Sequence, residues 1–107
     1  MERLTPAEEK VMLRLWELKE AVVKDIVLLY KDPKPAYNTV STIVRILEKK
    51  EFIKHKKKGR GFIYLPKISK EEYKDYLTDF LIYNYFDQDK NQLVSFLNKK
   101  QDLSSLL

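Results

Sequence analysis

Two neighbouring groups of side chains carry the chemistry that this sequence suggests. The first group shares one face of a helix expected over residues 38–49, and comprises Asn38, Thr39, Ser41, Thr42, Arg45 and Lys49. The amide, hydroxyl, guanidinium and ammonium groups of such a face can hydrogen-bond to base edges in the major groove of duplex DNA. This face is therefore a candidate base-reading surface.

The second group follows at once as a run of basic residues without an acidic one. Its candidate phosphate contacts are Lys56, Lys57, Lys58 and Arg60. The sequence predicts a β-hairpin with a basic tip. Its parts are an alternating pattern up to Lys58, a turn over 59–61, and a return strand over 62–65 that ends at Pro66. The glycines on both sides of Arg60 let the backbone take positive φ and approach a phosphate closely, and we expect the lysines to neutralise DNA phosphates. A solvated hairpin face is the less favoured reading.

Three helices have to position these groups. Thr5 and Glu8 form the pattern of a capping box before a helix over 6–18, whose expected core residues are Ala7, Val11, Met12, Leu15 and Leu18. A second helix is expected over 22–30, before the turn 32–35 with its two prolines. The third helix should begin between Ala36 and Asn38, with its core at Val40, Ile43, Val44 and Leu47. Ile46 lies outside that core stripe and suits either a thymine methyl group or packing on the second helix.

The order helix, helix, helix, hairpin is that of a winged helix-turn-helix. We therefore predict a mostly α fold with a small β-hairpin (α+β), in which residues 1–66 form the DNA-binding domain. The charge agrees, because these 66 residues contain 15 Lys and Arg against 9 Asp and Glu, while residues 67–107 contain 6 against 7.

The remaining residues, 67–107, are expected to form a helical dimerisation arm. Ser69 and Glu72 repeat the capping-box pattern before a helix to about Phe86, and a further helix follows Asp89. Both helices carry more apolar surface than so short a chain can bury, which favours a second copy of the chain as partner. The candidate dimerisation residues are Tyr73, Tyr76, Leu77, Phe80, Leu81, Leu93, Phe96 and Leu97.

Several function classes are disfavoured. The chain has no cysteine, one histidine and no glycine-rich phosphate loop, so we expect no enzyme, no cofactor and no metal site, and we expect His55 to be an ordinary surface side chain. No signal peptide and no apolar run of membrane-spanning length is present. These features favour a cytoplasmic protein without membrane insertion.

Three blocks of the sequence together resemble the penicillinase repressor family. They are residues 4–8 with Trp16, residues 37–50 with Thr39-Val40-Ser41-Thr42 at their centre, and residues 68–73. The resemblance implies a bacterial homodimeric transcriptional repressor that binds a palindromic operator on double-stranded DNA. It also implies release through a sensor-protease pathway that cleaves the arm, here between Ser95 and Phe96. A winged-helix module that binds proteins without reading DNA is the alternative.

The chain departs from the family pattern at four places. Glu51 stands where a glycine is usual after the Lys-Lys pair, and Ile46 stands where an arginine is usual. Ser95 precedes the expected cleavage position, where Asn is usual. A last helix is usual from about Leu103, close to where this chain stops.

Overall fold

A computed structural model describes residues 1–105, with side chains described up to residue 100. It divides the chain into two compact units, Met1–Glu72 and Tyr73–Leu107. Residues 106 and 107, the last of the predicted arm, lie outside the described residues. None of the described helices has the length and apolar composition needed to cross a lipid bilayer.

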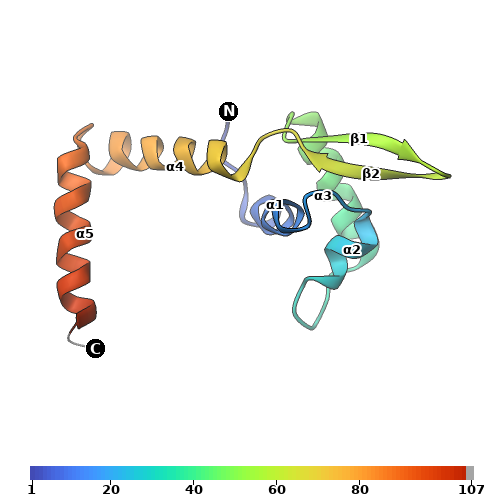
Figure 1. Ribbon diagram of the computed structural model, residues 1–107, viewed down its shortest axis with the longest axis horizontal. Coiled ribbons are helices and arrows are strands. Elements are labelled where there is room, and N and C mark those ends of the chain that lie inside the picture. The colour runs from blue at the N-terminus through green and yellow to red at the C-terminus, as the bar shows by residue number, and fades with distance from the viewer. Residues whose placement is uncertain (106–107) are drawn as a thin grey trace. The chain divides into compact units, whose positions relative to one another are not determined.

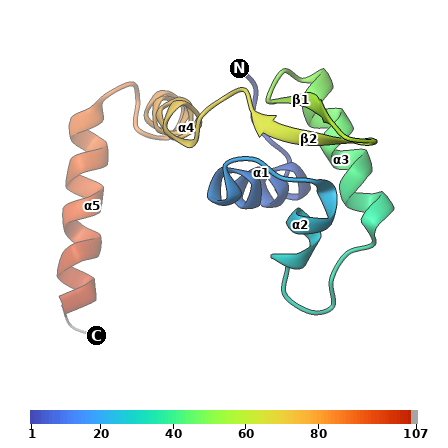
Figure 2. The same ribbon diagram turned by 45° about the vertical axis from the view of Figure 1, so that its right-hand side comes forward.

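The first unit has the predicted order of elements. Three helices, α1 (Pro6–Leu18), α2 (Val23–Leu28) and α3 (Tyr37–Lys49), precede strands β1 (Ile53–Lys58) and β2 (Gly61–Pro66). The two strands pair antiparallel, and the hairpin lies beside both α1 and α3 (Figures 1 and 2). The predicted α+β class and winged-helix order are confirmed.

The core of this unit lies between the three helices and the base of the hairpin. Its fully buried members are Val11, Met12, Leu15, Ile26, Val40, Val44, Leu47, Phe52 and Ile53. The core prediction is wrong for Ala7, which is exposed in the first turn of α1, and Leu18 and Ile43 are only half-buried. Glu8, and not Ala7, points into the interior, where hydrogen bonds and an ion pair hold its side chain.

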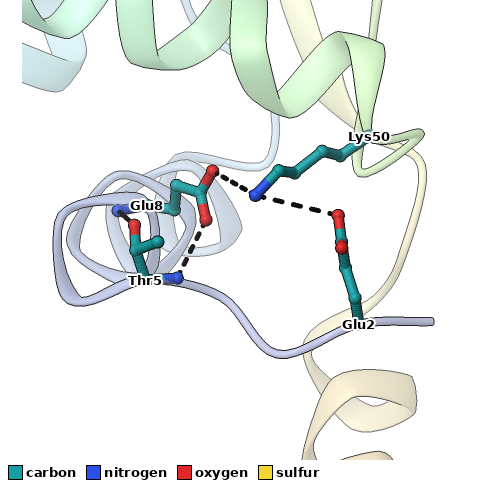
Figure 3. A network of polar contacts seen from close by, with 4 residues as sticks. All are labelled: Glu2, Thr5, Glu8 and Lys50. Carbon is teal, nitrogen blue, oxygen red and sulfur yellow. Dashed lines mark hydrogen bonds and ion pairs between the residues drawn. The ribbon is translucent and has the colours of Figure 1, made fainter.

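The predicted capping box at the start of α1 is confirmed and extends to the end of α3. The Thr5 backbone N–H donates to Glu8 Oε1 at 2.8 Å, and the Glu8 N–H donates to Thr5 Oγ1 at 3.2 Å. Lys50 Nζ lies 2.9 Å from Glu8 Oε2 and 3.7 Å from Glu2 Oε1 (Figure 3). One buried carboxylate thus caps α1 and holds the residue that ends α3.

Helix α2 is shorter than predicted at both ends. At its start, Ala21 pairs with Tyr64 of β2 through two backbone hydrogen bonds of 3.0 and 2.8 Å. This pairing keeps the chain extended into Val22, whose φ and ψ are −83° and 160°. At its end, Lys34 donates to the Leu28 carbonyl at 3.2 Å and to the Tyr30 carbonyl, so a side chain satisfies the last carbonyls in place of a further turn.

Helix α3 begins within the predicted interval but without the expected cap. Ala36 occupies the N-cap position and no side chain caps the helix, so Asn38 lies in the first turn and its side chain remains on the helix surface. The helix ends in a Schellman motif, in which Phe52 N donates to Leu47 O at 2.9 Å and Glu51 N donates to Glu48 O at 3.1 Å. Glu51 takes a φ of 69° there.

The hairpin turn is tighter than predicted. Lys58 pairs with Gly61, so Gly61 belongs to β2 and only Gly59 and Arg60 form the loop. Gly59 has a φ of 61°, whereas Gly61 is not among the residues with positive φ. Only Gly59 thus uses the positive φ that glycine permits, because a two-residue loop lets the strand begin one residue earlier.

The last two helices are α4 (Lys70–Tyr85) and α5 (Lys90–Ser105). The second predicted capping box is confirmed, since Ser69 and Glu72 exchange two hydrogen bonds of 3.0 Å. Asp89 begins α5 by accepting from the Asn91 N–H at 2.9 Å. Between the helices, Asp87 and Gln88 both take positive φ, which confirms a break in the polar stretch after Phe86.

Candidate DNA interface

The polar face of α3 is exposed because the opposite face is held in the core. Val40, Val44 and Leu47 are completely buried against neighbouring helices. The residues predicted to read bases lie on the other side, where Asn38, Thr39, Thr42, Arg45 and Lys49 are exposed and Ser41 is half-buried. The structure therefore places the whole predicted set on one helix, with only Ser41 partly covered.

The cationic groups of this face remain available. In the described part of the chain, neither Arg45 nor Lys49 forms an ion pair. The Thr42 hydroxyl donates to the Asn38 carbonyl at 2.9 Å, which leaves its oxygen lone pairs as acceptors. The face thus offers a free guanidinium, a free ammonium and a hydroxyl acceptor, which is a donor and acceptor set suited to base edges and phosphates.

The hairpin, which we call the wing, presents its cations unequally. Lys57, Lys58 and Arg60 are exposed near or at the loop, and no ion pair involves them within the described residues. Lys56 lies 3.7 Å from a carboxylate oxygen of Glu20, and its strand partner Ile63 is buried. Lys56 is therefore the predicted phosphate contact whose charge is partly matched within the chain itself.

A contact between α3 and the wing joins the two predicted surfaces. His55 Nδ1 pairs with Glu48 Oε2, and the imidazole forms T-shaped contacts with Phe62 at 4.8 Å and with Tyr64 at 6.2 Å between ring centroids. We call Glu48, His55, Phe62 and Tyr64 the wing cluster. It fixes β1 and β2 to the last turns of the helix that carries Arg45 and Lys49.

Sequence reasoning missed the wing cluster. His55 is exposed, as expected, but its pairing with a carboxylate of α3 was not foreseen. The available signal was that His55 shares the strand face of Ile53, which is buried. No group of three His, Asp or Glu residues that could hold a metal ion occurs in the described part of the chain.

The pKa of Tyr64 reflects its burial in the wing cluster and the charged groups around it. Burial raises the pKa of the Tyr64 hydroxyl, the Glu48 carboxylate and Tyr37 raise it further, and Arg45 lowers it. Tyr64 therefore stays neutral at physiological pH and leaves the positive charge of Arg45 uncancelled.

The predicted dimerisation residues differ in exposure. Tyr73 is buried within the single chain and stacks on Tyr76 at 5.8 Å between centroids, so its side chain is not available to a partner. The half-buried members are Tyr76, Leu77, Phe80 and Leu93. The exposed members are Leu81, Phe96 and Leu97. The apolar surface that remains open is thus concentrated in the later part of α4 and in α5.

The predicted cleavage position lies within a helix. Ser95 and Phe96 are both exposed in the first half of α5, and Phe96 packs against Phe86 at 5.5 Å between centroids. A protease requires an extended backbone, so cleavage of this bond would require the helix to open locally.

Comparison with known proteins agrees with the fold. Residues 4–106 match the family model described as penicillinase repressor, and no curated protein matches the chain. The family is one of transcriptional regulators and not a known class of enzymes, which supports a transcriptional repressor role for the chain. Since the match covers nearly every residue, the chain belongs to the penicillinase repressor family.

Proposed function

We propose that the chain is a homodimeric transcriptional repressor that binds a palindromic operator through the exposed face of α3 and the wing. The observation that carries the proposal is one exposed helix face on which Arg45 and Lys49 have no ion-pair partner among the described residues. The wing lies beside this face and carries three further cations without such a partner in the described part of the chain, Lys57, Lys58 and Arg60. Each chain reads one half-site in the major groove, and the wing neutralises adjacent phosphates. Its place of action is then the cytoplasm, where a bacterial chromosome lies.

The roles of helix and wing can be separated by two substitutions. Arg45→Ala should remove a base contact and weaken operator binding by about 1–3 kcal/mol, with little change on random DNA. Lys57→Ala should weaken binding to both DNAs alike and lower the slope of log K against log salt by about 0.9 for each chain. Lys99→Ala, which removes an exposed cation from α5, is the matched control and should change neither. Equal losses on both DNAs for Arg45→Ala would refute base reading by α3.

The exposed apolar residues of the arm support the proposed dimer. Two copies would cover Leu81, Phe96 and Leu97 and would place two α3 helices about 34 Å apart, one turn of the double helix. Leu97→Asp should give monomers, because a carboxylate would have to be buried in the interface. Gln92→Asp adds the same charge at an exposed polar position of α5 and should leave the dimer intact. Sedimentation of the unaltered chain as a monomer at tens of micromolar would contradict the dimer.

Loss of the dimer supplies a physical route to derepression. In a dimer the second half-site contact is effectively intramolecular, so separating the two chains weakens binding by orders of magnitude without altering either domain. We propose cleavage between Ser95 and Phe96 after local opening of α5 as the release step of a sensor-protease pathway. If the chain stays intact in induced cells while its operator is vacated, release proceeds by a ligand or a protein partner instead.

A further inference from the structure

One apolar side chain interrupts the exposed polar face of α3. Ile46 keeps 40% of its surface exposed, whereas Val44 and Leu47 on either side of it in sequence are completely buried. At about 100° per residue, Ile46 stands about 40° from Thr42 around the helix axis, and Arg45 stands about 60° from Thr42 on the other side. Ile46 therefore points with the polar groups and is not packed into the core.

The charges around Ile46 indicate what covers it. Arg45 precedes it and Lys49 follows one turn later on the same face, and neither has an ion-pair partner among the described residues. A protein partner with an apolar anchor site would have to desolvate both cations. A polyanion would instead neutralise them as Ile46 is covered. The local charge thus selects duplex DNA over a protein surface.

The major groove offers one apolar group to such a side chain. The C5 methyl group of thymine projects into it, whereas cytosine, adenine and guanine present hydrogen-bonding groups. We infer that Ile46 reads a thymine in each half-site by packing against its C5 methyl group. This inference rests on the proposed function and deepens it, since it assigns to Ile46 a specificity contact that excludes cytosine by the loss of the methyl group.

Replacing thymine by deoxyuridine tests the contact directly, because the exchange removes the methyl group and keeps the base pair. Duplexes that the unaltered chain enriches from a randomised pool serve as the probe. Each thymine is then exchanged singly, and the Kd is measured by fluorescence anisotropy at one salt concentration. At one position in each half-site, deoxyuridine should weaken binding of the unaltered chain about fourfold, the equivalent of one buried methyl group.

The variant Ile46→Ala should bind the thymine duplex several-fold more weakly and should no longer distinguish it from the deoxyuridine duplex. Ile46→Val, which keeps a branched side chain, should retain part of the discrimination. Leu13→Ala is the matched control, because Leu13 of α1 is 43% exposed and should leave the discrimination unchanged. Circular dichroism of each variant verifies that the fold is intact.

Two outcomes would overturn the inference, and they are distinguishable. In the first, the unaltered chain enriches a sequence, but every deoxyuridine exchange changes the Kd of the unaltered chain and of Ile46→Ala by the same factor. Ile46 then reads no methyl group, and the proposed repressor function stands. If the unaltered chain enriches no sequence, operator binding itself is wrong and the inference falls with it.

Discussion

Glu51 holds a backbone conformation that side chains other than glycine rarely adopt. Its φ of 69° places it in the left-handed region, where the C′ residue of a Schellman motif must lie. An L-residue in this region costs about 1–2 kcal/mol relative to the right-handed helical region, and glycine avoids that cost. The departure from the family glycine at this position is thus a local strain, and its removal should stabilise the domain.

The size of the effect follows from three contributions. Glu51→Gly removes about 1–2 kcal/mol of strain, is opposed by the greater freedom of glycine in the unfolded chain, and loses the ion pair with Lys67. That pair is 69% and 51% exposed on its two sides, so it contributes at most about 1 kcal/mol. At the middle of these ranges the three contributions leave Glu51→Gly more stable than the unaltered chain by about 0.3 kcal/mol. Glu51→Ala loses the same ion pair and keeps the strain, so it should be about 1 kcal/mol less stable than Glu51→Gly.

Urea unfolding followed by Trp16 fluorescence measures this difference. Trp16 is the single tryptophan, and its indole N–H donates to the Ile68 carbonyl at 2.9 Å, so its emission reports unfolding of the first unit. Lys10→Gly places glycine in the exposed interior of α1, where φ is helical, and should lower stability by about 1 kcal/mol. If Glu51→Gly proves no more stable than Glu51→Ala, the strain at Glu51 does not exist and the reasoning is wrong.

Two further predictions concern the ion pairs that hold α3. Burial raises the pKa of Glu8, but the bonds from Lys50 and Thr5 outweigh it, so the folded-state pKa lies below the ordinary value of 4.5. The stabilisation from this carboxylate is therefore complete above pH 4.5 and is lost as the pH falls through the lowered folded-state pKa. Glu8→Gln should flatten the acid side of a plot of Tm against pH, and it should cost about 1 kcal/mol of stability at pH 7. In the wing cluster, His55→Ala should leave the Glu48 carboxylate unpaired beside DNA and weaken DNA binding about threefold to tenfold. The free energy of unfolding should fall by less than about 0.5 kcal/mol, because the pair is exposed. Glu48→Gln in the same chain should restore the affinity in an anisotropy titration, and a double variant as weak as His55→Ala would contradict the electrostatic cause.

Structural features that depend only on residues close together in the sequence were predictable. Both capping boxes need only two side chains three residues apart, and each was confirmed with its hydrogen bonds. The exposed face of α3 follows from a hydrophobic pattern with a period of 3.6 residues, and the hairpin strands follow from one with a period of 2. Each pattern repeats often enough along the chain to be recognised. Sequence therefore predicted correctly which face of α3 is exposed and where the hairpin forms.

Features that depend on distant backbone or on a single side chain were not predictable. The start of α2 is displaced because Ala21 pairs with Tyr64, and a backbone bridge leaves no signature in side-chain type. The contact between Glu48 and His55 crosses the end of α3, so neither helical nor strand periodicity links the two residues. The burial of Glu8 ran against the expectation for a carboxylate, because its partner Lys50 lies 42 residues away in the sequence.

Two of these contacts involve the end of α3, next to the wing: Lys50 with Glu8, and Glu48 with His55. The proposed function would give this position a reason. Reading bases and neutralising phosphates together requires a fixed angle between helix and hairpin, since a misplaced wing would lose its phosphate contacts when the helix is seated in the groove. Three contacts fix that angle here. Lys50 binds the α1 cap, Glu51 turns the chain at positive φ, and Glu48 holds His55 of β1. Under the proposed function, the residues between Glu48 and His55 would serve as a joint that orders the interface before DNA binds, which would reduce the entropy lost on binding.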